Sequence, residues 1–470
     1  MFRFRTVLLS DDEAEPDFAE TEVDTRRINL TRFELFFPEK RSFFLEGANL
    51  FEFSSGLEKN FIPFHSRRIG IGVEDELTIP IDRGAKLVGR AGRWGIAALG
   101  VGMGGTDATR STRMFAGRAT CDASDHLRVG TIATLGDPEG RQDTGLVGFD
   151  AVWHTTDFRG GKNLTASVWA AKSSGDLPAD GDFTKFRRTG WGFKVDYPND
   201  LWALSAQADE FGDALDARLG FLPRPGTRRT KLAGAYQPRP SGPPLDWARQ
   251  FFYQLSASRV DDLEGSTESW TMFATPFAVS TRSGEHGEVS HQPMFDRLDS
   301  PYTPAPRSAP GVTIPPGAYR FTRYGAEFAS ADHRRWQAGG SLWLGGFYSG
   351  HLTQLAPYAG WNSRSGRLRL RLKGEADSGR FPGGEFALRL YQLQAVYAFS
   401  PDIVISSYTQ YDSESRKAGM NNRLRFTIRP GRDLYVVWNR NWRRPSGDGP
   451  HAPTEIDDQV VVKLRWTFRW

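Results

Sequence analysis

Cysteine is nearly absent from the sequence, because Cys121 is the only one among 470 residues. A disulfide framework needs at least two cysteines, and so does a cysteine-based zinc site, so both are excluded. Long apolar runs are missing as well. No stretch approaches the roughly 18 consecutive apolar residues that mark a membrane-spanning helix.

The common motifs of enzymes are also missing. The sequence contains no GxSxG nucleophile elbow, P-loop, HExxH helix or Cys/His metal spacing. Acid pairs such as Asp75/Glu76 and Asp261/Asp262 could serve a glycosidase, but that chemistry needs carboxylates about 5–9.5 Å apart in space. We therefore predict no metal and no cofactor, and we keep a membrane-associated hydrolase as an alternative only.

The N-terminus lacks a complete signal peptide. The sequence MFRFRTVLLS has a basic start, but its apolar core is only about four residues long. Residues 11–24 follow with eight acids and no base. Such a run predicts a solvated acidic tail.

Alternation of apolar and polar residues dominates the rest of the chain. The 50 glycines and 28 prolines indicate many turns, and from about residue 84 they separate segments of strand length. In residues 366–375, GRLRLRLKGE, leucine and arginine alternate, and NRLRFTIR at residues 422–429 repeats the pattern. Since period two places alternate side chains on opposite faces, the sequence predicts an all-β protein with about 18–20 antiparallel strands.

Two segments do not follow this pattern. Residues 278–316 include seven prolines between 291 and 316, which predicts a long surface loop without strands. Residues 29–53 are rich in phenylalanine and charge, and Thr31 and Glu34 have capping-box spacing. We expect a short helix there that ends at Pro38, within a compact folded segment.

The alternation fits either a soluble sheet or a membrane barrel. A soluble β protein would place its tryptophans in a core. Three features favour the barrel: segments near the 9–11 residues of a transmembrane strand, aromatics near strand ends, and low hydropathy. We predict a transmembrane antiparallel β-barrel over residues 61–470, preceded by an acidic tail and a plug-like segment over residues 1–60.

The last ten residues, VVKLRWTFRW, form the most regular amphipathic strand. Leu464, Trp466, Phe468 and Trp470 alternate with polar residues. The pattern resembles the C-terminal sorting strand of bacterial outer-membrane barrels, which assembly machinery recognises by pairing with its edge. We therefore expect two partners, the lipid bilayer and the barrel-assembly machinery.

Arginines occupy the polar face of the predicted strands. If the leucines face lipid, the lumen is lined by Arg367, Arg369, Arg371, Arg423, Arg425, Arg429, Arg465 and Arg469. A confined cationic wall attracts anions, although pairing of these arginines with internal Asp and Glu is the alternative. A nucleic acid is not an expected partner, because the basic residues alternate along strands and form no known motif. We further expect a charge cluster in the plug-like segment, made of Glu34, Glu39, Lys40, Arg41, Glu46, Arg67 and Arg68.

Several motifs resemble one family. NLTRFELFFPEKRSFFLEG (29–47) followed by PFHSRRIG (63–70) looks like the beginning of an uncharacterised family of bacterial outer-membrane barrel domains, a domain of unknown function. ARLGFLPRP (217–225) and NNRLRFTIRPGRDLYVVWNR (421–440) are similar to later motifs of that family. In this family an N-terminal domain like a family 9 carbohydrate-binding module usually precedes the barrel. His65 departs from the pattern, which has an aromatic such as Tyr there.

The resemblance implies a location in the bacterial outer membrane and a chain shortened at its N-terminus. It implies no established activity. The expected function is therefore binding or passage of a surface substrate, with a carbohydrate or an anion as candidate ligand, through an arginine-rich lumen. The alternatives are a membrane anchor or scaffold with a sealed lumen for a sugar-binding domain, and the hydrolase.

Overall fold

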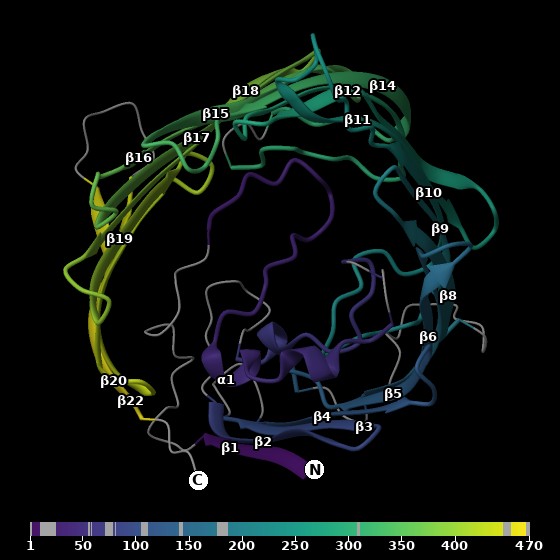
Figure 1. Ribbon diagram of the computed structural model, residues 1–470, viewed down its shortest axis with the longest axis vertical. Coiled ribbons are helices and arrows are strands. Elements are labelled where there is room, and N and C mark those ends of the chain that lie inside the picture. Colours follow the sequence, from purple (N-terminus) through teal and green to yellow (C-terminus); the bar gives the residue numbers. More distant parts are fainter. Residues whose placement is uncertain are drawn as a thin grey trace. The chain divides into compact units, whose positions relative to one another are not determined.

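The computed structural model describes residues 2–9, 25–54, 57, 59–70, 79, 81–104, 111–140, 144–175, 187–307, 311–444 and 453–466, with only the backbone of 2–9 and 465–466. Nearly all regular structure is strand, which confirms the all-β prediction (Figure 1). The helical pieces are α1 (Ser42–Leu45), η2 (Ala48–Phe51) and η3 (Ser66–Arg68). Among the described residues, no helix is long and apolar enough to cross a membrane.

The strands belong to one sheet of 22. Their bounds are β1 (Phe2–Leu9), β2 (Ile81–Ala91), β3 (Trp94–Met103), β4 (Thr112–Asp122), β5 (Leu127–Leu135), β6 (Gly145–Phe158), β7 (Lys162–Ser174), β8 (Thr189–Pro198), β9 (Trp202–Phe211), β10 (Thr227–Tyr236), β11 (Ala248–Asp262), β12 (Thr267–Thr281), β13 (His286–Leu298), β14 (Gly317–Ala329), β15 (Trp336–Phe347), β16 (Gly350–Asn362), β17 (Leu368–Phe381), β18 (Gly384–Ala398), β19 (Ile403–Asp412), β20 (Lys417–Arg429), β21 (Arg432–Arg443) and β22 (Thr454–Trp466).

Sequence neighbours pair antiparallel from β1 to β9 and from β12 to β22. The strand number exceeds the predicted 18–20, because β1 and β13 were not recognised as strands. Among the residues that the structure describes, no pairing joins β22 to β1. Closure into a barrel therefore stays a prediction.

The chain forms two compact units. The first contains most of residues 33–234, and the second most of residues 269–470. The predicted boundary near residue 60, between a plug-like segment and a barrel, stays a prediction.

In the first unit, residues 33–70 cover one face of the sheet, and we call them the covering segment. Its phenylalanines, among them Phe44, Phe51 and Phe61, pack into two clusters with apolar residues of β2 to β7. Figure 1 shows α1 beside β2 to β4. The opposite face exposes large apolar side chains such as Phe149 and Phe193. Each strand of this unit thus buries one set of alternate residues under the covering segment.

The predicted helix over residues 31–38 is wrong. Residues 31–33 form a bend and residues 34–40 are irregular, while the helical turn comes later, at Ser42–Leu45. The Thr31 hydroxyl donates to Asn29 Oδ1 at 2.7 Å, and the Thr31 N–H donates to the same atom. The Thr31 hydroxyl is therefore engaged with Asn29, two residues earlier, and does not cap a helix that follows.

In the second unit, the predicted loop over residues 278–316 is much shorter. β12 extends to Thr281 and β13 occupies His286–Leu298, so only residues 299–316 connect β13 to β14. The β12–β13 ladder is irregular between Ala274 and Phe277, around Pro276, and Pro293 pairs with Thr322 of β14. Of the seven prolines between 291 and 316, only Pro293 lies within a strand, and the other six lie in the connection over residues 299–316.

The remaining loop is folded. Tyr302 and Ile314 form an antiparallel bridge, and the loop packs with Leu30 against β13, β14 and β16 in an apolar cluster. The Tyr348 hydroxyl donates to Asp296 Oδ2 at 2.6 Å, and Arg32 Nη2 donates to Asp296 Oδ1 at 3.1 Å. Ile28, Leu30 and Arg32 thus pack within this unit.

Candidate functional site

The predicted arginine face lies on four neighbouring strands of the second unit. Arg369 of β17 is opposite Val396 of β18, which is opposite Ser406 of β19, which is opposite Arg423 of β20. Since residues paired across a ladder point to the same face, these four side chains share one face. The flanking arginines Arg371 and Arg425 follow with period two on the same face.

A cavity of about 640 Å³ lies over this face. Four guanidinium groups line it, and the carboxylate of Asp332 is the only acidic group among its lining residues. The other lining residues are the neutral polar Gln337, Asn362, Gln394 and Ser406 and the apolar Leu370, Val396 and Val404. The cavity therefore has a strong excess of positive charge from the four residues Arg369, Arg371, Arg423 and Arg425.

Three of these arginines, Arg369, Arg371 and Arg425, make few contacts with the rest of the protein. Arg369, Arg371 and Arg425 form no ion pair with any residue that the structure describes. The Arg371 guanidinium lies 5.4 Å from the centroid of the Tyr358 ring. Arg425 Nη2 donates to the Pro401 carbonyl at 3.5 Å, whereas its buried Nε has no hydrogen-bond partner among the described atoms. Three of the four guanidinium groups thus keep most of their donors available.

The other predicted lumen residues lie near strand ends or outside the described residues. Arg367 and Arg429 are exposed near the ends of β17 and β20. The side chain of Arg465 and all of Arg469 lie outside the described residues. The same holds for the side chain of Trp466 and for Phe468 and Trp470, so the sorting strand stays a prediction; the described Leu464 side chain is exposed.

The reverse face of the same four strands is apolar. Leu370 and Leu372 of β17, Leu393 of β18, Ile405 of β19 and Ile428 of β20 are all exposed large hydrophobics. Leu372 is directly opposite Leu393. Arginine and aliphatic faces are therefore separated by the thickness of one sheet, as the alternation predicts.

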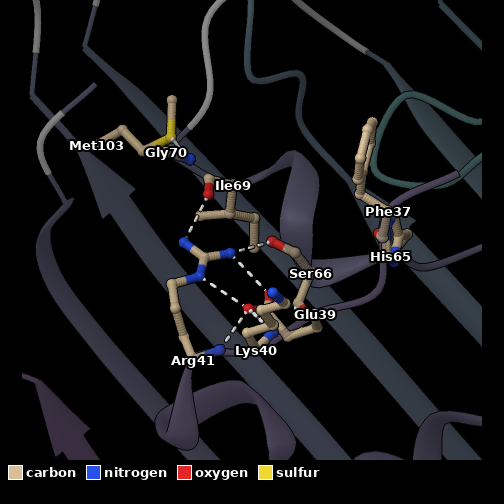
Figure 2. A network of polar contacts seen from close by, with 9 residues as sticks. All are labelled: Phe37, Glu39, Lys40, Arg41, His65, Ser66, Ile69, Gly70 and Met103. Atoms are coloured by element: carbon tan, nitrogen blue, oxygen red, sulfur yellow. Dashed lines mark hydrogen bonds and ion pairs between the residues drawn. The ribbon is translucent and has the colours of Figure 1, made fainter. Parts of the chain in front are cut away.

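The covering segment contains a second polar centre, shown in Figure 2. The Arg41 guanidinium donates from Nη1 to the Ile69 carbonyl and from Nη2 to the Ser66 carbonyl, both at 2.8 Å. Its Nη2 also lies 2.7 Å from Glu39 Oε2, and the Ser66 hydroxyl donates to that same oxygen at 2.7 Å. Burial opposes ionisation of Glu39, but these hydrogen bonds outweigh it and hold its pKa below the usual range. This network joins the two parts of the family-like motif.

The rest of the predicted charge cluster is dispersed. The Lys40 N–H donates to Glu39 Oε1 at 2.9 Å, and the Arg67 guanidinium lies 5.5 Å from the centroid of the Phe37 ring. Glu34 is exposed. Glu46 contributes its carbonyl oxygen, which accepts from Lys86. Within the predicted cluster, Glu39 and Arg41 meet directly as an ion pair.

His65 is held neutral beside this network. Burial lowers its pKa to about 4, and although Glu39 acts in the opposite direction, Arg67 and Arg68 lower the pKa further. A neutral ring is consistent with Nε2 donating to the Phe37 carbonyl at 3.0 Å. The ring also lies 4.8 Å from that of Phe36, so His65 fills an aromatic position.

The His65→Phe variant should lose pH dependence of its stability. In the wild type, the unfolded chain takes up a proton near pH 6.5 but the folded chain only near pH 4. The contribution of neutral His65 to the free energy of unfolding is therefore complete above pH 6.5. As the pH falls towards 4, the free energy of unfolding decreases by up to about 3 kcal/mol. Denaturant unfolding at several pH values measures this. The exposed His126→Phe is the control, and an unchanged slope in His65→Phe would refute the assignment.

Three strand residues that the sequence did not single out hold the covering segment. Lys86 of β2 is buried and donates to the Phe43 and Glu46 carbonyls. Arg118 of β4 and Asp150 of β6 form a buried ion pair. Arg118 Nε donates to the Glu52 carbonyl at 3.1 Å, and the Ser54 N–H donates to Asp150 Oδ2 at 3.0 Å. The charges that bind this segment thus come from the sheet.

The later motif at 217–225 also contacts the covering segment. Ile62 and Phe221 form an antiparallel bridge, and the His65 N–H donates to the Leu219 carbonyl. A Cβ atom at Gly220 would lie 2.0 Å from the Ile62 carbonyl oxygen. Glycine is therefore required there by close approach of two backbones.

The acid pairs considered for hydrolysis have structural roles or lie outside the description. Asp75 and Glu76 belong to the residues that are not described. Asp261 pairs with Arg259 at 2.8 Å, and Asp262 Oδ1 accepts from the N–H groups of Glu264 and Ser266 in the turn between β11 and β12. Both carboxylates of this pair are thus engaged in local contacts.

Comparison with known proteins gives one family. Residues 11–88 match the model of a family described as a domain of unknown function, DUF5916. No curated protein matches the sequence. The match includes the covering segment and most of β2, so the Glu39–Arg41 network lies within the matched residues. The expected sugar-binding companion domain stays a prediction.

Proposed function

We propose that this chain, whose residues 11–88 belong to an uncharacterised domain family, is a bacterial outer-membrane β-barrel that binds or passes an anionic substrate along its arginine face. In this proposal the sheet closes on itself, so that no strand edge is left unpaired in lipid. The apolar faces contact the acyl chains, and the arginine face borders an aqueous lumen.

One observation carries the proposal: β17 to β20 expose aliphatic side chains on one face and guanidinium groups on the other. A soluble sheet with one wet face would bury the aliphatic set, because exposed apolar patches of this extent are rare in monomeric soluble proteins. The strands are also long. β17 has 14 residues and β18 has 15, more than the usual 5–6 of soluble strands and enough to span a bilayer when tilted.

Anion selectivity of the reconstituted protein tests the proposal. In a planar bilayer with a salt gradient, the wild type should conduct with a reversal potential that favours anions. Replacing Arg369, Arg371, Arg423 and Arg425 by Gln should shift that potential towards the cation side. A conducting channel without anion preference would contradict the proposed role of the arginines.

A sealed anchor is the second candidate, and the packing of the covering segment favours it. Lys86, Arg118 and Asp150 bind this segment to the sheet through its backbone, so it would obstruct a lumen. The same recordings separate the two candidates. A folded, membrane-inserted protein that stays silent in the bilayer would indicate the anchor.

A further inference from the structure

The four cavity arginines form two separate pairs. Arg369 and Arg371 belong to β17, and Arg423 and Arg425 belong to β20. Between the pairs, β18 and β19 contribute only neutral side chains to the cavity, including Gln394, Val396 and Ser406. Positive charge is therefore concentrated at two ends of the site with an uncharged floor between them.

The register sets the dimensions of this arrangement. Arg369 and Arg423 lie in one cross-strand row, three strands apart. Neighbouring strands are about 4.8 Å apart, so the backbones of the two pairs are about 14 Å apart. Within each pair, the two arginines are two residues apart along a strand, which is about 7 Å.

The spacing between the two arginine pairs restricts the shape of a ligand that can contact both of them. A single sulfate or phosphate carries about two negative charges at neutral pH, so it cannot neutralise all four guanidinium groups. A ligand that satisfies both pairs carries at least two oxyanion groups separated by a spacer that crosses the neutral floor. Arginine suits such groups, because its fork donates to a carboxylate, sulfate or phosphate in a bidentate manner.

We propose that this cavity is a binding site for an extended polyanion, whose anionic groups lie on the β17 pair and the β20 pair at once. The proposal rests on the proposed function, in that it takes this face to border an accessible lumen. The spacer would lie over the amide and hydroxyl groups of Gln394 and Ser406, which can donate hydrogen bonds to a hydroxylated chain. The Tyr358 ring beside Arg371 offers an apolar surface at one end.

Equilibrium binding to the full folded chain in detergent tests this. The probes are a sulfated tetrasaccharide, an oligogalacturonate tetramer, a linear polyphosphate and inorganic sulfate, each titrated by calorimetry at fixed salt. The variants are Arg369→Gln with Arg371→Gln, and Arg423→Gln with Arg425→Gln. The control is Arg380→Gln, because Arg380 is also on β17 but its side chain is 82% exposed and lies on the other face.

We expect at least one extended probe to bind at least tenfold more tightly than sulfate. Each double variant should weaken the binding of that extended probe at least tenfold, since two charge-assisted contacts are lost in either case. Sulfate binding should change little, because the remaining arginine pair can still hold a sulfate. Which probe binds best identifies the anionic group. The matched Arg→Lys double variants keep the charge, and they serve in place of any glutamine pair that does not fold.

Two results would overturn the inference: equal affinity for sulfate and for all extended probes, or sensitivity to one arginine pair alone. Either could occur in an anion-selective channel, so the inference can fail while the proposed function stands. Conversely, a protein that binds the extended probes through both pairs but neither inserts nor conducts would refute the proposed function alone.

Discussion

Replacing Arg118 by Met is expected to destabilise the protein by about 3–5 kcal/mol, the usual cost of leaving a buried charge without its partner. The side chains of Arg118 and Asp150 are only 2% and 3% exposed, and Arg118 Nη2 donates to Asp150 Oδ2 at 2.8 Å. The substitution also removes the hydrogen bond from Arg118 to the Glu52 carbonyl of the covering segment. An unpaired carboxylate would then remain beneath that segment.

Denaturant unfolding of the detergent-solubilised protein measures this loss. The matched control is Arg128→Met, because Arg128 pairs with Asp122 at 2.6 Å but in an exposed position. That pair should contribute no more than about 1 kcal/mol. Equal effects of the two substitutions would show that the Arg118–Asp150 pair is not buried in the folded protein.

The Phe61→Ala variant should be destabilised by a similar amount, about 3–5 kcal/mol in the free energy of unfolding, because the substitution removes a ring from a buried aromatic cluster. Phe61 is 1% exposed, and its ring centroid is 5.0 Å from that of Trp169 and 5.9 Å from that of Phe211. The resulting cavity lies between the covering segment and β7. We therefore expect faster proteolysis of the covering segment as well as lower stability.

Limited proteolysis together with denaturant unfolding measures both effects. Leu45→Ala is the control, since Leu45 lies in the same segment but is 48% exposed, and its loss should change stability by less than about 0.5 kcal/mol. If the Phe61→Ala variant is cleaved no faster than the Leu45→Ala variant, polar contacts alone hold the covering segment on the sheet.

The alternation of leucine and arginine was sufficient to predict the strands around residues 366–375 and 422–429 and the sharing of one face by their arginines. Period two depends only on backbone geometry, so it can be read without knowing the fold. Which strands are neighbours depends on long-range pairing. The joining of Arg369 and Arg423 in one row across two intervening strands therefore could not be predicted from the sequence.

The anchors of the covering segment were missed for a different reason. Lys86, Arg118 and Asp150 each occupy a single polar position in an alternating strand, where any polar residue looks alike. Their burial becomes visible only once the covering segment lies over them. The small residues beside them, as in GAKLVG around Lys86, are a weak signal of close packing that could have been used.

The Glu39–Arg41 pair was predicted as part of a larger charge cluster, which as a whole stays a prediction. Glu39 and Arg41 meet because Arg41 also binds the carbonyls of Ser66 and Ile69, which fixes its direction. The helix expected from Thr31 and Glu34 does not form, and the Thr31 hydroxyl that would cap it binds the side chain of Asn29 instead.

The central claim is that the sheet closes into a membrane-embedded barrel. Gel mobility of the detergent-extracted protein, produced with a bacterial signal peptide and compared boiled and unboiled, tests this most directly. A closed barrel pairs all its strand edges and resists SDS until heated. We predict a heat-dependent mobility shift for protein recovered in the outer-membrane fraction. A soluble protein whose mobility is the same before and after boiling would contradict it.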